Sequence, residues 1–370
     1  MQILNQTPTK AEFTMGMDKA AREYLSLVVK GTFVFPDGPH DPPRPAEDLR
    51  PLVMADEYAG APGFSAPLWE SDFAFRKTRC DVVLQGAAHA PGGRPADRVR
   101  VGVMVGGWSK QFDVVGQRQW QTLGPAVTAT RPYPFTRQPF SYDTAFGGPD
   151  RSLTGNPGPP VYAANPVGLG FASATGHGEI TGLALPNTED PRDPVVSPFG
   201  AYRPMALGPV GRGWPDRRRF AGTYDEAWTK EVVPFLPADF DERYYQMAPA
   251  DQQTDFPRPG TPVVLMNLTP RGREEFRLPD TALPIRVHRG SEVAFDAAVL
   301  PDTLIVDTEA RVFMLVWRIW VPTRRIVTEF TEAWIGPPTP AMLRAREAGR
   351  SILSVTATAG PGEDEEEAAP

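Results

Sequence analysis

Carboxylates and aromatic side chains alternate within residues 222–253, GTYDEAWTKEVVPFLPADFDERYYQMAPADQQ. Two carboxyl groups about 5–10 Å apart, in different environments, can act as acid and base on a glycosidic bond. Asp239 with Asp241, or Asp225 with Glu226, have suitable side chains for that chemistry. Acidic residues near helix starts also cap the helix or complement its dipole, worth about 0.3–1 kcal/mol each. The segment therefore leaves two alternatives open, a carboxylate-lined catalytic cleft and a surface that binds another protein.

Metal-binding residues are sparse and scattered. The chain has one cysteine, Cys80, and four histidines, none of them in H-x-x-x-H or H-E-x-x-H spacing: His40, His89, His177 and His288. This pattern does not indicate a zinc cluster. We expect the histidines to be exposed or singly hydrogen-bonded. Cys80 begins an apolar run, so we expect it to be buried, as free cysteines usually are.

Motifs for nucleophilic catalysis and for phosphate binding are absent. The sequence has no G-x-S-x-G, the strained serine turn of α/β-hydrolases, and no G-x-x-x-x-G-K-[ST] phosphate loop. The glycine-rich stretches GPVGRGW and NPVGLGF lack the dinucleotide fingerprint. We expect no cofactor and no enzymatic activity. For the basic group Arg212, Arg217, Arg218 and Arg219 we expect a solvated loop or a partner for the acidic C-terminal tail.

Composition excludes several classes of protein. The net charge of −7 argues against nucleic-acid binding, which draws its affinity from neutralised phosphates. A single thiol cannot form an internal disulfide, and no secretory signal or run of about 18 apolar residues is present. We therefore expect a cytoplasmic protein without membrane insertion. The 43 prolines and 34 glycines favour short strands joined by ordered, irregular loops over long helices.

Strand patterns flank an irregular middle. RVRVGVMVG, with valines at 99, 101, 103 and 105, alternates strictly and is the clearest strand. In YLSLVVKGTFVF, residues 24–35, Ser26, Lys30 and Thr32 share one side, so we expect only the opposite, apolar side to be buried. The predicted fold is mainly β: two packed antiparallel sheets, sandwich-like, with a long Pro/Gly-rich irregular insertion and one C-terminal helix. The predicted regions are an N-terminal β-strand region 1–120, an irregular layer 121–260, a C-terminal β-strand region 261–336, a helix 337–354 and an acidic disordered tail 355–370.

The irregular layer is rich in the residue types that protein interfaces favour. Two short helical pieces are predicted there, in TYDEAWTKE and PADFDERYYQ. Large aromatics on a proline-fixed backbone suit recognition at low entropy cost. The candidate protein-binding residues are Tyr142, Phe146, Trp214, Tyr224, Trp228, Phe235, Phe240, Tyr244 and Tyr245. The candidates for bracing the loops through side-chain hydrogen bonds to backbone groups are Asp251, Gln252 and Gln253.

Several phrases in register resemble the bacterial domain-of-unknown-function family twenty-one sixty-nine. They occur in the order NQTP, VVKGTFVF, YDTAFGG, NPVGLGF, LPNTEDP, GPVGRGW, GTYDEAW, FLPADFDERYYQMAPADQQ and LTPRG. The resemblance spans about residues 1–335. Some members of that family continue into pentapeptide repeats, which this chain lacks.

The resemblance implies a role in type VI secretion. It implies a non-enzymatic adaptor or chaperone that binds a secreted effector protein and helps to load it onto the spike protein. The alternatives are a carboxylate-dependent hydrolase acting on carbohydrate, and a structural component of the spike. The resemblance names no catalytic residue, in agreement with the motif search.

Overall fold

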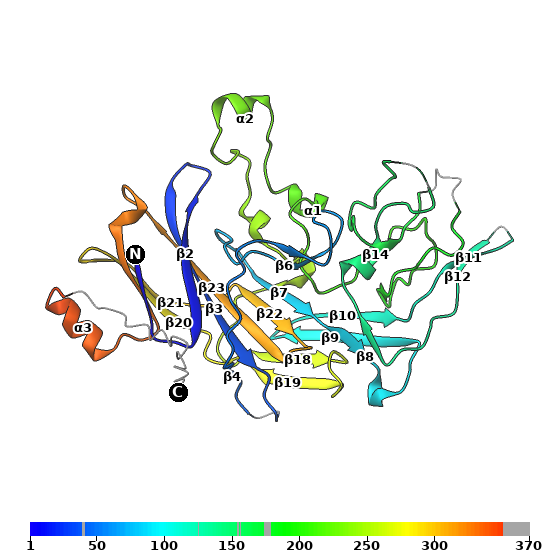
Figure 1. Cartoon of the computed structure of the whole chain (residues 1–370), viewed down its shortest axis with the longest axis horizontal. Helices are drawn as coiled ribbons and strands as arrows, with labels where there is room; N and C mark the ends of the chain where they lie inside the picture. The colour runs from blue at the N-terminus through cyan, green and yellow to red at the C-terminus, as the bar shows by residue number, and fades with distance from the viewer. Residues whose placement is uncertain (39–40, 125, 154, 156, 174–178, 351–370) are drawn as a thin grey trace, which may run out of the picture.

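Strands dominate the computed structural model of the chain, which describes residues 1–38, 41–124, 126–153, 155, 157–173 and 179–350 (Figure 1). Strands account for 39% of the chain and helical segments for 10%, which confirms the prediction of a mainly β fold. Within the described ranges, no helix has the length and apolar content needed to cross a membrane. Three larger sheets form the body of the molecule, one more than predicted.

The largest sheet has seven strands and runs through the centre of the molecule (Figure 1). Its strands lie in the order β17 (Gln253–Thr254), β7 (Cys80–Gln85), β22 (Thr303–Asp307), β23 (Val312–Pro322), β3 (Glu23–Val34) and β2 (Thr9–Met17), with β4 (Arg44–Pro45) paired to the end of β3. The β7–β22 pair is parallel and its neighbours are antiparallel. This sheet brings the N-terminal and C-terminal strand sets side by side.

Two further sheets pack against one face of the central sheet. One has five strands in the order β16 (Thr188–Glu189), β10 (Trp108–Val115), β9 (Arg98–Val105), β18 (Pro262–Met266) and β19 (Arg273–Arg277). The other has four, in the order β1 (Gln2–Asn5), β24 (Phe330–Ile335), β20 (Leu283–Arg289) and β21 (Glu292–Val299). Leu27 of β3, Val101 of β9 and Ile285 of β20 belong to the same buried cluster. Each such side chain contributes about 1.5–3 kcal/mol of burial free energy, so this shared core fixes the sandwich-like arrangement.

The valine alternation in β9 is as predicted, but the prediction for β3 is wrong on its polar side. All four valines of β9 are buried. In β3, Ser26, Lys30 and Thr32 are buried as well. The reason is that the second face of the central sheet is also covered, and a carboxylate from that cover, Asp72, meets the Lys30 ammonium at 2.8 Å.

Buried ion pairs continue along this second face. Lys77 pairs with Asp81 at 2.6 Å, and Arg318 pairs with Asp302. Apolar residues of the face, among them Val316, pack in a separate cluster that includes Met247. Charged groups removed from water are tolerated only when paired and hydrogen-bonded, so this cover must hold Asp72 and Lys77 in fixed positions against the sheet.

The segments between the strands of the three larger sheets form short strand pairs and single helical turns. The pairs are β5 (Glu57–Tyr58) with β6 (Pro67–Trp69), β8 (Ala87–His89) with β13 (Arg137–Pro139), β11 (Trp120–Leu123) with β12 (Ala126–Ala129), and β14 (Phe146–Gly147) with β15 (Leu169–Gly170). The 3₁₀ turns are η1 (Pro91–Gly93), η2 (Tyr142–Thr144), η3 (Glu242–Tyr245), η4 (Ala250–Gln252) and η5 (Val327–Glu329), and two short helices are α1 (Pro215–Arg218) and α2 (Glu226–Glu231). In Figure 1, β11, β12 and β14 lie at the right end of the molecule, whereas α1 and α2 lie above the central sheet.

The C-terminal helix is shorter than predicted. α3 spans Pro340–Glu347, with the Thr339 hydroxyl accepting the Met342 backbone N–H at 3.2 Å. Met342 packs with Leu4 and Trp334. The helix ends there because Gly349 takes a positive φ of 64°, a usual device for stopping a helix. The predicted acidic tail lies outside the described residues.

Candidate functional site

Residues 222–239, which we call the arm, project from the body of the molecule with α2 at the far end (Figure 1). The two ends of the arm are fastened together. The Asp239 carboxylate accepts the Thr223 backbone N–H at 2.9 Å and its hydroxyl at 2.7 Å. Gly222 has a φ of 84°, and a Cβ there would lie 2.9 Å from Pro237. The close approach of these two segments therefore requires glycine at 222.

The tip of the arm is held by its own contacts rather than by burial. Asp225 caps α2 by accepting the Trp228 backbone N–H at 2.8 Å, and the Trp228 indole N–H donates to the Phe235 carbonyl at 2.9 Å. The rings of Tyr224 and Trp228 meet edge to face with centroids 4.6 Å apart. No residue of α2 is buried, and Tyr224, Val233 and Phe235 are 51%, 49% and 38% exposed. The arm thus presents ordered apolar surface to solvent.

The nine candidate aromatics divide between core and surface. Tyr224 and Phe235 are exposed, and Trp228, Tyr244 and Tyr245 are half-buried. The remaining four are buried, at 1–7% exposure: Tyr142, Phe146, Trp214 and Phe240. Phe146 sits in a cluster with Trp120 and Tyr202, and Phe240 packs against Tyr244 and Tyr245 at the root of the arm. These two side chains brace the fold and are not available to a partner.

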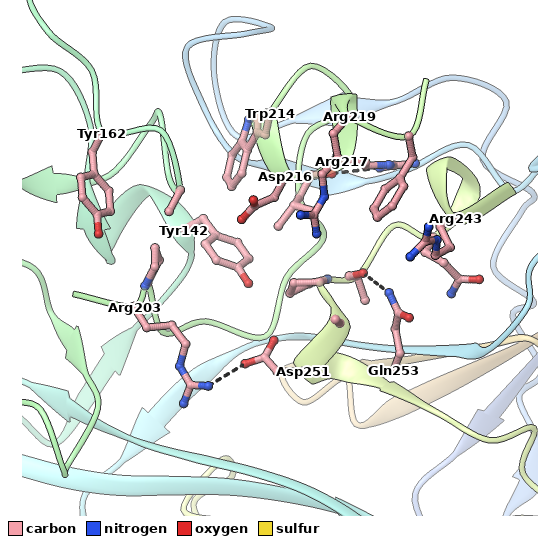
Figure 2. Close-up of a pocket in the computed structure, with 18 of the residues that line it drawn as sticks. Tyr142, Tyr162, Arg203, Trp214, Asp216, Arg217, Arg219, Arg243, Asp251 and Gln253 are labelled. Atoms are coloured by element: carbon pink, nitrogen blue, oxygen red, sulfur yellow. Dashed lines mark hydrogen bonds and ion pairs between the residues drawn. The ribbon is translucent and has the colours of Figure 1, made fainter. Parts of the chain in front are cut away.

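A pocket of about 480 Å³ opens beside the root of the arm, under α1 (Figure 2). Segments far apart in the chain line it, including those around Tyr142, Tyr162, Arg203, Trp214 and Asp251. Figure 2 shows Tyr162 and Arg203 toward one side of the pocket and Arg243 toward the other, with Tyr142 between them. Tyr142 and Trp214 meet edge to face at 5.4 Å and expose only a small part of each ring.

A buried glutamine fixes the floor of the pocket. The Gln252 amide oxygen accepts from Lys110 and from the Tyr142 hydroxyl, each at 3.0 Å. Its amide nitrogen donates to the carbonyls of Val82 and Gly208 at 3.3 and 3.2 Å. All of its hydrogen-bonding groups are used, as a fully buried amide requires. Burial also raises the pKa of Tyr142 well above its usual value, so the phenol stays a donor.

The neighbours of Gln252 brace the same floor in different ways. Gln253 donates to the Ala248 carbonyl at 2.8 Å. The Asp251 carboxylate instead pairs with the buried Lys110 ammonium at 2.8 Å, while its backbone carbonyl accepts the Trp108 indole N–H. Burial lowers the pKa of Lys110, and Asp251 opposes that shift. Gln252 and Gln253 thus make side-chain bonds to backbone of the predicted kind, and Asp251 does not.

The basic group near α1 is not a solvated loop throughout. Arg217 is buried and pairs with Glu70 at 2.6 Å, and Arg212 pairs with Asp56 at 2.8 Å. These two arginines anchor α1 to the segment before β7, which corrects the prediction for them. Arg218 and Arg219 are exposed, and neither has an ion-pair partner among the described residues.

The arm and the pocket lie within a single match to a protein family. Residues 20–318 match the family described as an uncharacterized protein conserved in bacteria, DUF2169. The chain belongs to the DUF2169 family. Comparison of this chain with the curated proteins and with the solved structures gave no match. The DUF2169 match contains every residue of the arm and of the pocket lining.

Two candidate carboxylates at the root of the DUF2169 arm have structural partners. Asp239 is held by Thr223, and that backbone hydrogen bond lowers its pKa. Asp241, just beyond the arm, pairs with Arg243 at 2.6 Å, and the hydrogen bond from the Arg243 side chain lowers its pKa. A general acid needs a raised pKa, so these environments run against acid catalysis. Over the described ranges, no group of three or more His, Cys, Asp or Glu side chains is placed to hold a metal ion.

The prediction for the histidines is wrong at one position. His288 is buried against Trp334, with ring centroids 4.6 Å apart, and neither ring nitrogen has a hydrogen-bond partner within the described structure. The nearby charged side chains of Glu332 and Arg346 bond to each other and not to the imidazole. His89 lies 4.0 Å from Glu309, and His40 and His177 lie outside the described residues. Cys80 is fully buried, as predicted.

Several residues that line or support the pocket were not found from the sequence. Arg203 lines it, whereas Lys110 and Glu70 lie behind the lining and pair with Asp251 and Arg217. All three lie in segments without any recognisable motif. The one available signal was the alternation in SKQFDVV, where Lys110 falls in phase with Phe112 and Val114 and so on the buried side of β10. A lysine in phase with core residues predicts a buried partner, although not which one.

Proposed function

We propose that this DUF2169 protein is a non-enzymatic adaptor that acts in the cytoplasm. It would bind a type VI secretion effector and help to load it onto the spike protein. The resemblance in the sequence supplies the secretion context. The arm is the observation that carries the proposal, because it is a built projection whose exposed side chains do nothing for the core.

The physical case rests on preorganisation. Burying an exposed aromatic side chain in an interface contributes most where the side chain is already ordered. Tyr224 is ordered by Trp228, and Trp228 by Phe235. Pro234 and Pro237 restrict the backbone between α2 and the root of the arm, where Thr223 and Asp239 meet. A client that covers this tip would bury apolar surface without first having to order it.

Co-purification tests the proposal. The tagged full-length protein would be expressed with the products of neighbouring effector and spike genes, and each complex would be isolated by affinity and size-exclusion chromatography. Tyr224→Ala with Phe235→Ala should lower effector capture by at least about tenfold, the loss expected from about 1.4 kcal/mol of binding free energy.

The matched control is Tyr133→Ala, which removes an aromatic side chain that is 77% exposed but lies away from the arm. It should leave capture unchanged. A protein that binds neither effector nor spike would refute the adaptor function. Equal losses for the arm and control variants would refute the role of the arm.

A further inference from the structure

We propose that the pocket at the root of the arm binds a linear segment of the client protein in which a large apolar side chain adjoins a carboxylate. This rests on the proposed adaptor function and assigns a second, chemically defined contact to it. The pocket and the arm are continuous, because Arg219 and Phe220 immediately precede the arm and Arg243 follows it closely.

The size and rigidity of the pocket suit an inserted side chain. Its volume of about 480 Å³ falls within the range typical of small-ligand sites, about 300–1,000 Å³. The walls are fixed before any partner arrives, since Tyr142 is bonded to Gln252 and Arg217 to Glu70. A preformed site loses little entropy when it binds.

The apolar part of the pocket lies in its middle. Tyr142 and Trp214 meet edge to face in the lining, to which Pro249 and Ala250 also belong. These groups offer ring faces and backbone but no charge. A Phe, Tyr, Trp or Leu side chain would fill this part and gain roughly 1.5–3 kcal/mol from burial.

Charge is uneven between the two sides. Phe220 has two guanidinium groups over its ring, that of Arg243 at 4.3 Å and that of Arg219 at 4.8 Å from the centroid. Arg243 is paired with Asp241, but Arg219 has no carboxylate partner in the described part of the chain. One positive charge is therefore uncompensated at the Phe220 side.

The other side is balanced. Arg203 pairs with Asp190 at 3.0 Å and lies 4.0 Å from Asp251, whose charge Lys110 offsets. Asp216, the second carboxylate of the lining, lies toward Trp214 in Figure 2, away from Arg243. The carboxylate of the bound segment is accordingly placed beside Arg219, whose guanidinium has no ion-pair partner in the described part of the chain and can make bidentate contacts.

The chain's own acidic tail is the competing occupant. Residues 363–367 are all acidic, but residues 356–370 contain no large apolar side chain. The tail could satisfy Arg219 and would leave the aromatic middle of the pocket empty. The two-part chemistry of the pocket thus favours a client segment over the tail.

Peptide binding to the full-length protein tests the assignment. Three fluorescent probes would be compared by anisotropy: a capped peptide with phenylalanine flanked by glutamates, the same peptide with lysines for glutamates, and residues 355–370 of this chain. The glutamate–phenylalanine peptide should bind at least about tenfold more tightly than either of the others. Binding that is equal for the lysine peptide, or tightest for the tail peptide, would overturn the proposal.

Two neighbouring arginines supply a matched pair of variants. Arg219→Glu should weaken the glutamate–phenylalanine peptide by at least about tenfold. Arg218→Glu makes the same charge change at an exposed residue outside the lining and should have little effect. Equal effects of the two variants would refute a local site and leave only general electrostatic attraction.

The test separates this assignment from the adaptor function. A protein that binds the glutamate–phenylalanine peptide, but captures neither effector nor spike, keeps the pocket and loses the adaptor role. A protein that captures its effector but binds none of the probes loses the pocket assignment alone.

Discussion

Protonation of His288 should make the stability of this protein depend on pH between about pH 4 and pH 6.5. The imidazole is 1% exposed, lies against Trp334, and has no hydrogen-bond partner on either nitrogen among the described residues. Burial, reinforced by the nearby Arg346 guanidinium and only partly opposed by the Glu332 carboxylate, lowers its pKa from 6.5 to about 4. The folded protein therefore keeps His288 neutral at pH values where the unfolded chain has bound a proton.

The sign and size follow from linkage. A histidine whose folded pKa is depressed destabilises the protein as pH falls below the unfolded pKa, and the loss levels off below the folded pKa. A shift from 6.5 to about 4 corresponds to a total loss of roughly 3 kcal/mol, of which about 2 kcal/mol should appear between about pH 7 and pH 5. For a domain of this size, that is a substantial share of a total stability of about 5–15 kcal/mol.

Urea unfolding at a series of pH values measures this effect. Carboxylates also titrate as pH falls, so the informative quantity is the difference in unfolding free energy between the natural protein and His288→Phe. Phenylalanine preserves a ring against Trp334 and cannot be protonated. The variant should gain about 2 kcal/mol on the natural protein between about pH 7 and pH 5.

His89→Phe is the control, because His89 is only partly buried and lies near Glu309, whose charge opposes the lowering of its pKa. Its difference from the natural protein should change less with pH. If the His288→Phe difference stays constant from about pH 7 to pH 5, then His288 titrates near its ordinary pKa, and the argument from burial fails.

Three further substitutions test the interior and the arm. Lys30→Met leaves the buried Asp72 carboxylate without its 2.8 Å partner, although Arg318 remains 3.9 Å away. We expect the unfolding free energy measured in urea to fall by about 3 kcal/mol. A fall below about 1 kcal/mol would contradict the buried pair. Gly222→Ala places a Cβ against Pro237 at a φ of 84°. It should raise protease cleavage and hydrogen exchange within the arm by about tenfold, with little change in Tm. An arm as protected as before would contradict the close approach of its two ends. Gln252→Leu removes four hydrogen bonds from the pocket floor and should cost about 2–4 kcal/mol in thermal or urea unfolding, and a neutral result would show that water replaces the amide.

Local patterns predicted those features that local chemistry decides. The alternate valines of β9 identified a strand because side chains of a strand alternate between faces, and all four valines are buried. Capping was one of the explanations for the acidic residues of the segment 222–253, and Asp225 and Asp241 each accept a backbone N–H at the start of a helical turn. The second predicted helix, however, is a single 3₁₀ turn, η3, which begins after the Asp241 cap.

Features that depend on distant partners were not predictable. Lys30 looked like a solvent-facing residue because its partner, Asp72, comes from a loop 42 residues away. Arg217 looked solvated for the same reason, since Glu70 lies 147 residues earlier in the chain. The pocket joins segments from Tyr142 to Gln253 that share no motif. Sequence patterns gave the residue types of the candidate site, and only the tertiary structure gave their arrangement.

The fastening of Thr223 to Asp239 has a consequence for how such a protein can change. Because the arm leaves and rejoins the body at one point, its sixteen or so intervening positions can be lengthened, shortened or exchanged without altering the path of the sheets. The arm can therefore be exchanged as one segment. Under the proposed adaptor function, an arm taken from one such protein and placed between residues 222 and 239 of another would carry its preference for a client with it, while the fold of the recipient stayed the same.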